Sequence, residues 1–258
     1  MELIKHESID KVLAVLHDNL EDCIYMYIDI SKYGIDNPNL KVWTNDDYSV
    51  IVMRYYGSIS IYAADDANLD GVVDIINEEK VCTMSGKRSV IERLSEQLAD
   101  DYDTEYGYVF EFKNYDEIEN DLNIETATVD DMHDIAALIC RNKYFSGMYD
   151  LENLASQLAE RLETGMGRNY VVRDGDKIIA HIASYAEYEN IATTSGLAVD
   201  EEYENGIFMR VLEAYLVNRL WEDGFTVYTF ITSKLRKRYL SILKNDLVSE
   251  YGKLVKKG

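Results

Sequence analysis

Two hydrophobic periods alternate along the second half of the chain. Apolar residues spaced three and four apart predict amphipathic helices, and strict alternation predicts half-buried strands. Asp174-Gly175 separates two strand-like runs, and such a pair is a strong hairpin signal. The predicted order is a strand at 124–126, helices at 132–140 and 151–162, strands at 169–173, 177–185 and 191–199, a helix at 206–220, a strand at 226–231, a helix at 234–243 and a strand at 248–255.

The first half shows the same two periods but no motif that carries chemistry. Its predicted elements are helices at 9–20, 69–77 and 90–98, a hairpin formed by 48–56 and 58–63, and a strand at 106–112. We find no metal-ligand spacing, nucleophile motif or glycine-rich phosphate loop in it, and interpret it as a folding or packing partner of the second half. The polar stretch 115–123 marks a domain boundary, which gives domains 1–123 and 124–258.

Charge is divided unevenly between these halves. The chain has 26 Lys+Arg and 48 Asp+Glu, a net charge of −22. Residues 1–123 hold 10 basic and 27 acidic side chains, a net −17, and residues 124–258 hold 16 and 21, a net −5. Nucleic-acid phosphates and anionic membranes both need a positive face, so we expect neither as a partner.

Composition also bears on location and metal binding. No apolar run reaches the roughly 18 residues of a spanning helix, and residues 1–30 fit neither a signal peptide nor a transit peptide. Three widely spaced cysteines favour reduced thiols in a cytoplasmic protein. The four histidines show no metal spacing, so we predict no metal site.

The order of elements in the second half, with its loop sequences, resembles the GCN5-related N-acetyltransferase (GNAT) family over about residues 124–258. The matching runs are IETATVDDMHDIAALI at 124–139, YVVRDGDKIIAHIASY at 170–185, GLAVDEEYENGIFMRVL at 196–212, and residues 229–254. The resemblance implies an α+β (α/β) fold with a mixed, mostly antiparallel sheet flanked by helices. A smaller α/β domain precedes it, and the order of its elements also permits a degenerate GNAT-like unit.

The resemblance further implies acetyl-CoA as cosubstrate, with its pyrophosphate at the start of a helix. The family pattern is a basic residue or Gln, two residues, Gly, one residue, then Gly or Ala. The corresponding residues here are Glu204, Asn205, Gly206, Ile207 and Phe208, so a carboxylate replaces the basic residue and one glycine remains. A carboxylate about 5 Å from a phosphate charge costs on the order of 3 kcal/mol at an effective dielectric of about 20.

Cations elsewhere could compensate for that carboxylate. Lys234, Arg236, Lys237 and Arg238 form the one basic cluster of the chain, although a solvated helix face explains them equally well.

By the same resemblance, a backbone N–H among Leu197, Ala198 and Val199 would polarise the thioester carbonyl, as an oxyanion donor does. Gly196 favours an irregular strand there, although a plain bulge explains it too. Tyr239 stands where the family often has the acid that protonates the departing thiolate, and Thr232 replaces the usual Asn seven residues before it.

No residue is predicted as general base. His181 lies on a strand, where a single histidine is more often a satisfied core or surface residue than a catalytic one. Two functions therefore stay open from the sequence. One is N-acetyltransfer from acetyl-CoA to an amine of a small molecule or peptide, favouring a cationic acceptor through electrostatic steering. The other is a catalytically degenerate GNAT fold that binds a ligand or another protein.

Overall fold

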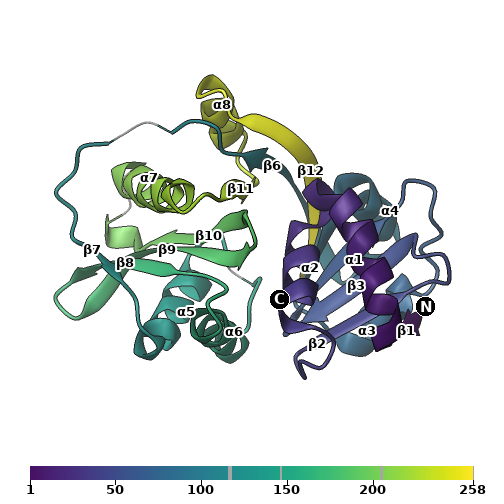
Figure 1. Cartoon of the computed structure of the whole chain (residues 1–258). Coiled ribbons are helices and arrows are strands. Elements are labelled where there is room, and N and C mark those ends of the chain that lie inside the picture. Colours follow the sequence, from purple (N-terminus) through teal and green to yellow (C-terminus); the bar gives the residue numbers. More distant parts are fainter. Residues whose placement is uncertain (116–117, 146, 204–205, 258) are drawn as a thin grey trace. The chain divides into compact units, whose positions relative to one another are not determined.

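The chain forms two compact units. The computed structural model describes residues 1–115, 118–145, 147–203 and 206–257, with only the backbone of 206 and 207. Unit 1 comprises Met1–Val109 with Val248–Gly258, and unit 2 comprises Phe110–Leu247 (Figure 1). The C-terminal segment, which the sequence analysis grouped with the second half, thus packs with the first, because strand pairing joins residues that are distant in sequence.

Unit 1 has helices on a mixed sheet. Its elements are β1 (Glu2–Leu3), η1 (His6–Ser8), α1 (Ile9–Asp18), α2 (Leu20–Tyr33), β2 (Leu40–Thr44), β3 (Val50–Tyr55), β4 (Ser58–Ala63), α3 (Val72–Glu79), β5 (Thr83–Lys87), α4 (Arg88–Leu98), most of β6 (Tyr102–Glu111) and most of β12 (Asp246–Lys256).

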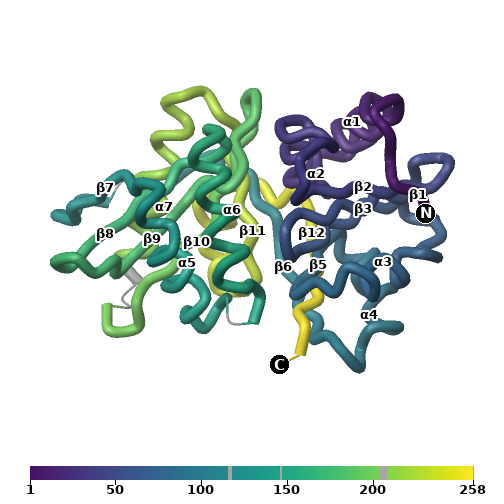
Figure 2. Tube along the Cα trace, turned by 90° about the horizontal axis from the view of Figure 1, so that it is seen from below, coloured from purple at the N-terminus to yellow at the C-terminus, as the bar shows by residue number. Residues whose placement is uncertain are grey.

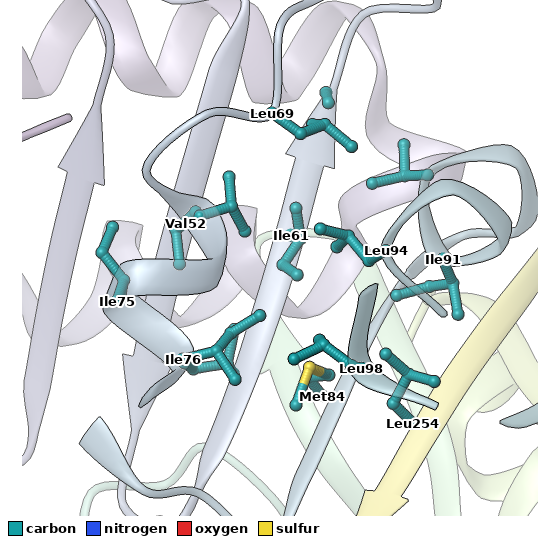
Figure 3. Close-up of a cluster of buried hydrophobic side chains, with 14 of the residues drawn as sticks. Val52, Ile61, Leu69, Ile75, Ile76, Met84, Ile91, Leu94, Leu98 and Leu254 are labelled. Carbon is teal, nitrogen blue, oxygen red and sulfur yellow. The ribbon is translucent and has the colours of Figure 1, made fainter. Parts of the chain in front are cut away.

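The sheet of unit 1 incorporates the last strand of the chain. Strands β1 to β4 pair antiparallel in sequence order, β4 pairs parallel with β5, and β12 pairs antiparallel with β5 (Figure 2). Leu254 of β12 is fully buried among apolar side chains from the helices and strands of unit 1, among them Ile61, Met84, Ile91 and Leu94 (Figure 3). Burial of this strand therefore stabilises unit 1.

Unit 2 repeats this organisation. Its elements are β7 (Ile124–Thr126), η2 (Val129–Asp131), α5 (Met132–Arg141), α6 (Leu151–Glu163), β8 (Asn169–Asp174), β9 (Lys177–Tyr188), β10 (Ile191–Val199), η3 (Glu201–Tyr203), α7 (Gly206–Glu222), β11 (Thr226–Ile231) and α8 (Lys234–Ile242).

In the sheet of unit 2, β7 to β10 pair antiparallel in sequence order and β10 pairs parallel with β11. Helices α5 and α6 cover one face and α7 covers the other (Figure 1). Ile135, Ile139 and Leu158 of the first two helices pack on Val171 and Ala198 of the sheet. After β6 the chain continues along β11, where Phe112 N donates to Val227 O at 2.8 Å.

The two units share one order of elements and strands. Each begins with a short strand and two helices, continues with a three-strand antiparallel meander, and adds a helix and a parallel strand. The strand orders β1-β2-β3-β4-β5 and β7-β8-β9-β10-β11 correspond one to one, with the same directions. This correspondence is the one required if the first half is itself a GNAT-like unit.

The predicted fold class is confirmed: the chain is α+β, and helices flank a mostly antiparallel sheet in each unit. Strands 124–126, 191–199 and 226–231 were predicted with their observed bounds, and the Thr128–Asp131 capping box is formed. Helix α2 and strands β2 and β5 were not predicted; both strands are only five residues long. Within the described residues, no helix is long and apolar enough to cross a membrane.

Candidate active site

The parallel strands β10 and β11 frame the candidate site of unit 2. Their Cα register runs from Ile191–Thr226 to Thr194–Thr229, while β10 continues to Val199 and β11 to Ile231. The two strands therefore stop pairing before they end. Helix α7 begins at Gly206, shortly after β10, so its first-turn N–H groups carry the positive end of the helix dipole.

Strand β10 is irregular where the sequence analysis expected it to be. Between Ser195 and Ala198 its register with β9 shifts, because Ala183 pairs with Ser195 and His181 with Ala198. Gly196 has a φ of +63°, a left-handed conformation that glycine adopts without strain. A Cβ at this position would lie 2.4 Å from Tyr185 Oη and 3.0 Å from His181 Cε1. Both the backbone conformation and the lack of space for a Cβ thus favour glycine in the backbone bulge at Gly196 (the β10 bulge).

His181 lies fully buried beside this bulge. Its Nδ1 is 2.7 Å from Gly196 O, and its Nε2 is 2.9 Å from Oδ1 of Asn169. Burial lowers the pKa of His181 to about 4, and the hydrogen bond to the Gly196 carbonyl opposes this shift only in part. The ring is therefore neutral at pH 7, as expected of a satisfied core histidine.

The three predicted oxyanion donors have different surroundings. Leu197 is half-buried, whereas Ala198 and Val199 are buried. Val199 O accepts a hydrogen bond of 3.2 Å from Asn142 Nδ2, and Asp200 N donates to Ile179 O at 2.8 Å, which returns the chain to the sheet. Leu197 is consequently the residue at the centre of the irregular stretch.

Tyr239 lies half-buried on α8. The guanidinium carbon of Arg210, from the second turn of α7, lies 5.3 Å from the centroid of its ring. Such a cation over an aromatic face is attractive and becomes more so when the ring gains negative charge. Thr232 is exposed between β11 and α8, and Ser233 caps α8 by accepting from Arg236 N at 3.3 Å.

A buried polar cluster joins α7 and α8 below Tyr239. Glu213 of α7 is only 2% exposed and accepts hydrogen bonds from Tyr115 Oη and from the Arg236 guanidinium. Burial and then the Glu213 charge raise the pKa of Tyr115 well above its ordinary value. Although burial disfavours its charge, Glu213 keeps the pKa of Arg236 above the ordinary value. The Arg236 guanidinium is thus paired with Glu213. It is not available as one of the cations that the sequence suggested could offset the Glu204 carboxylate near the phosphates.

The predicted pyrophosphate loop is described only in part. Glu204 and Asn205 lie outside the described residues. Gly206 and Ile207 begin α7, and Phe208 is half-buried on its first turn. Among the described residues, Arg210 on α7 and Lys234 and Arg238 on α8 are exposed cations.

The sequence analysis missed Arg210, Tyr115 and Glu213. Glu213 is the one acid in the otherwise apolar run 211–217, a pattern that indicates a buried, partnered carboxylate. No comparable signal marks Tyr115, which the sequence analysis placed in a boundary segment.

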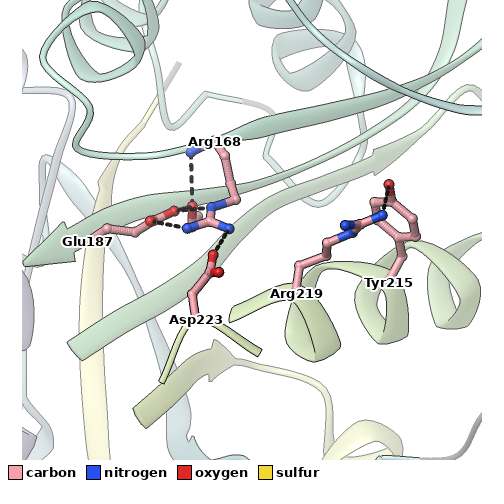
Figure 4. Close-up of polar contacts among 6 residues, drawn as sticks. Arg168, Glu187, Tyr215, Arg219 and Asp223 are labelled. Atoms are coloured by element: carbon pink, nitrogen blue, oxygen red, sulfur yellow. Dashed lines mark hydrogen bonds and ion pairs between the residues drawn. The ribbon is translucent and has the colours of Figure 1, made fainter. Parts of the chain in front are cut away.

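Glu187, near the end of β9, is excluded as a free general base. Its side chain is 9% exposed and receives two hydrogen bonds from Arg168, of 2.8 and 2.7 Å, while Arg168 Nη1 bonds Asp223 Oδ2 at 2.7 Å (Figure 4). These carboxylates raise the pKa of Arg168 above its ordinary value against the opposing effect of burial. This cluster lies where β10 and β11 begin, at the opposite end of the strands from the bulge.

Unit 1 lacks the chemistry of this site at the equivalent loop. Residues 64–71, between β4 and α3, contain Asp65, Asp66 and Asp70 and no basic residue. Lys87, at the end of the parallel strand β5, is held 3.2 Å from Asp65 and 3.3 Å from Asp22. Among the residues that the structure describes, no cluster of His, Cys, Asp and Glu could hold a metal ion in either unit.

The residues of unit 2 fit the thioester end of an acyl-CoA. Leu197 lies beyond the paired part of the parallel strands, and Tyr239 offers a proton donor with the Arg210 cation over its ring. The residues that would hold the phosphates are the start of α7 and the exposed cations named above.

No protein-family model matches the chain, and no curated protein matches its sequence. Solved structures do match its fold. A Drosophila protein is 13% identical with a TM-score of 0.64, over 98% of both chains. A GCN5-related N-acetyltransferase-like protein from Streptococcus suis is 11% identical with a TM-score of 0.62, over 96% of this chain and 100% of that one.

A GCN5-related N-acetyltransferase from Kribbella flavida is 9% identical with a TM-score of 0.59, over 96% of both chains. At these identities the likeness concerns the fold, and the chain has the fold of the GNAT acetyltransferases.

Proposed function

We propose that unit 2 transfers an acetyl group from acetyl-CoA to an amine of a small molecule or peptide. The observation that carries this proposal is the β10 bulge at Gly196, in the strand that pairs parallel with β11 in a GNAT fold. A strand backbone that leaves its regular pairing is suited to polarising a carbonyl, because its N–H groups are fixed before the charge develops.

The proposed steps assign a role to each residue. The ammonium of the acceptor loses one proton to water, and the neutral amine attacks the thioester carbonyl carbon while backbone N–H groups of Leu197–Val199 stabilise the oxyanion. The C–S bond then breaks, Tyr239 donates its phenolic proton to the thiolate, and the second proton of the nitrogen passes through water to the tyrosinate. Arg210 stabilises this tyrosinate, since its guanidinium lies over the ring.

The phosphates of the cosubstrate would lie at the start of α7. Helix-dipole attraction contributes about 0.3–2 kcal/mol there. Arg210, Lys234 and Arg238 are the exposed cations that would add to it, since Arg236 is bound to Glu213.

The acceptor we propose is a cationic amine, such as a polyamine or a basic peptide. A chain of net charge −22 attracts cations over long range and raises their association rate. We place the reaction in the cytoplasm. Three free cysteines support a reducing compartment, and we propose neither nucleic acid nor a membrane as a partner.

A second candidate is a GNAT fold that binds a ligand or protein without turnover. The observation in its favour is that Arg236, in the middle of the basic cluster, is half-buried and paired with the buried carboxylate of Glu213, and is thus unavailable to phosphates. On this view the site would bind a less anionic ligand than CoA.

Titration calorimetry with acetyl-CoA and with CoA separates the two candidates. Binding of both supports the enzyme, and no heat at millimolar ligand contradicts it. A thiol-release assay against an amine panel then tests turnover, which we expect to fall about 10²–10⁴-fold in Tyr239→Phe, the range for loss of an acid catalyst. Tyr215→Phe, also on a helix and stacked with an arginine, is the matched control and should keep full turnover. Equal turnover in both variants would remove Tyr239 from its role.

A further inference from the structure

A buried polar chain crosses three strands of unit 2 next to the proposed site. Asn169 of β8, His181 of β9 and Gly196 of β10 are linked through the two ring nitrogens of the histidine, at 2.9 and 2.7 Å. Asn169 is 1% exposed and His181 is 0% exposed. The imidazole lies on the sheet face that α5 and α6 cover, because its register partners Val171 and Ala198 belong to the core on that face.

The hydrogen bonds fix the tautomer of the ring. A carbonyl oxygen can only accept, so Nδ1 must carry the proton that is donated to Gly196 O. A neutral imidazole then presents Nε2 as an acceptor, and Asn169 must offer its amino group there. As placed, Asn169 presents Oδ1 to Nε2 at 2.9 Å, so this tautomer requires a half-turn of the carboxamide, which exchanges its oxygen and nitrogen at constant volume.

The hydrogen bond to Gly196 O also determines where the N–H of the same peptide group points. The Gly196–Leu197 peptide is trans and planar, so its C=O and N–H point in opposite directions. Because His181 holds the carbonyl toward the α5 and α6 face, the N–H of Leu197 is directed away from it. Within the described strand registers, Leu197 has no Cα partner in β9 and lies beyond the last pair with β11.

We propose that His181 is a positioning residue that sets the orientation of the Leu197 N–H as the oxyanion donor of unit 2. It does so through the carbonyl of the same peptide and does not itself touch the reacting atoms. The catalytic part of this inference rests on the proposed acetyl transfer. The positioning part concerns the protein alone.

The alternative is that His181 only fills the core. A core-filling residue would be replaceable by any side chain of similar size and polarity. A positioning residue must keep a donor at the location of Nδ1. Two substitutions separate these roles, since Asn carries its amide nitrogen near Nδ1 and Gln carries its own near Nε2. Both are uncharged amides, so they differ mainly in where the donor lies.

The first measurement needs neither variant nor ligand. The ¹⁵N spectrum of the full chain at pH 7 should show His181 with Nδ1 protonated and Nε2 unprotonated. The opposite tautomer would overturn the proposal, because Nδ1 could then not donate to the Gly196 carbonyl.

The orientation of the Leu197 N–H bond in the free protein, obtained from residual dipolar couplings, is the second measurement. We expect the coupling of this N–H to change in His181→Gln and to stay near its wild-type value in His181→Asn, because only asparagine keeps a donor at the location of Nδ1. Equal couplings in the two variants would contradict positioning, whatever the function of the protein.

Turnover provides the third measurement. We expect kcat about 10²-fold to 10³-fold lower in His181→Gln, as for loss of an oxyanion donor, with the dissociation constant of CoA unchanged because CoA has no thioester carbonyl. His181→Asn should restore most of kcat. If wild type neither binds CoA nor turns over, the proposed function fails, while the dipolar-coupling comparison still decides whether His181 orients Leu197.

Discussion

Tyr115 donates a hydrogen bond to the buried carboxylate of Glu213, 98 residues further along the chain. The bond fastens the segment after β6 to α7, and Arg236 joins α8 to the same carboxylate. Asn245 Oδ1 holds the segment from the other side, accepting from Lys113 N at 2.7 Å and Asn114 N at 2.9 Å. The helix that carries Tyr239 is thereby fixed through buried polar contacts and not only through apolar packing.

Removing the Tyr115 hydroxyl should destabilise unit 2. Tyr115→Phe leaves one oxygen of a buried carboxylate without this donor, so we expect a loss of about 1.5–3 kcal/mol in the free energy of unfolding. Urea denaturation measures it. Tyr203→Phe is the control, because its hydroxyl also donates to a carboxylate, that of Asp174, in a hydrogen bond that is exposed to solvent. Similar losses in the two variants would show that burial of Glu213 contributes nothing.

Gly196→Ala should be more costly than an alanine at another left-handed glycine. The left-handed conformation alone costs an alanine about 1–2 kcal/mol. At Gly196 the new Cβ would also lie 2.4 Å from Tyr185 Oη, whereas at Gly165 (φ +68°) it meets nothing within 4 Å. We expect urea denaturation to give a clearly larger loss for Gly196→Ala than for Gly165→Ala. Equal losses would mean that the β10 bulge relaxes without cost.

Stability should fall on mild acidification because of His181. Its pKa is about 4 in the folded chain and about 6.5 when unfolded, so between these values the unfolded state binds more protons. The free energy of unfolding is then constant above the unfolded pKa and falls below it by up to about 1.4 kcal/mol per pH unit. Urea denaturation between pH 7 and pH 4 checks this, and His181→Asn should remove that part of the slope. If the variant kept the wild-type dependence of the free energy of unfolding on pH, groups other than His181 would be responsible for the acid sensitivity.

Arg168→Met should weaken the end of the sheet opposite the proposed site. The substitution removes the guanidinium that donates two hydrogen bonds to Glu187, whose side chain is only 9% exposed. It also removes the cation that pairs with Asp223. Breaking such a partly buried pair from one side should cost about 2–3 kcal/mol. Arg168→Lys should recover only part of this, because an ammonium cannot reproduce the planar fork.

The measurement for this pair is again urea denaturation, with Arg219→Met as control. Arg219 is exposed on α7 and contacts Tyr215, so its loss should have little effect (Figure 4). Full recovery by lysine would indicate that only the charge matters at this position.

Local patterns determined most of unit 2. The hairpin at Asp174-Gly175, the capping box at Thr128 and the strand 191–199 each depend on neighbouring residues, and each was predicted from them. Gly196 was recognised as irregular for the same reason, since glycine inside a strand pattern is a local signal. His181 was interpreted as a satisfied core or surface residue, and the structure shows which of the two it is, with partners that were not predicted.

Only the tertiary structure decided which distant residues meet. It placed the last strand in unit 1, brought Tyr115 to Glu213, and paired Arg236 with that carboxylate so that the basic cluster lost its central cation. These contacts depend on how strands pair and helices pack between segments that are distant in sequence. Hydrophobic periodicity carries no information about which distant segments meet. The sequence by itself determined the elements of a GNAT-like fold and the bulge on which the proposed chemistry depends. The fold decided which side chains surround that bulge, because burial and partners are properties of the assembled sheet.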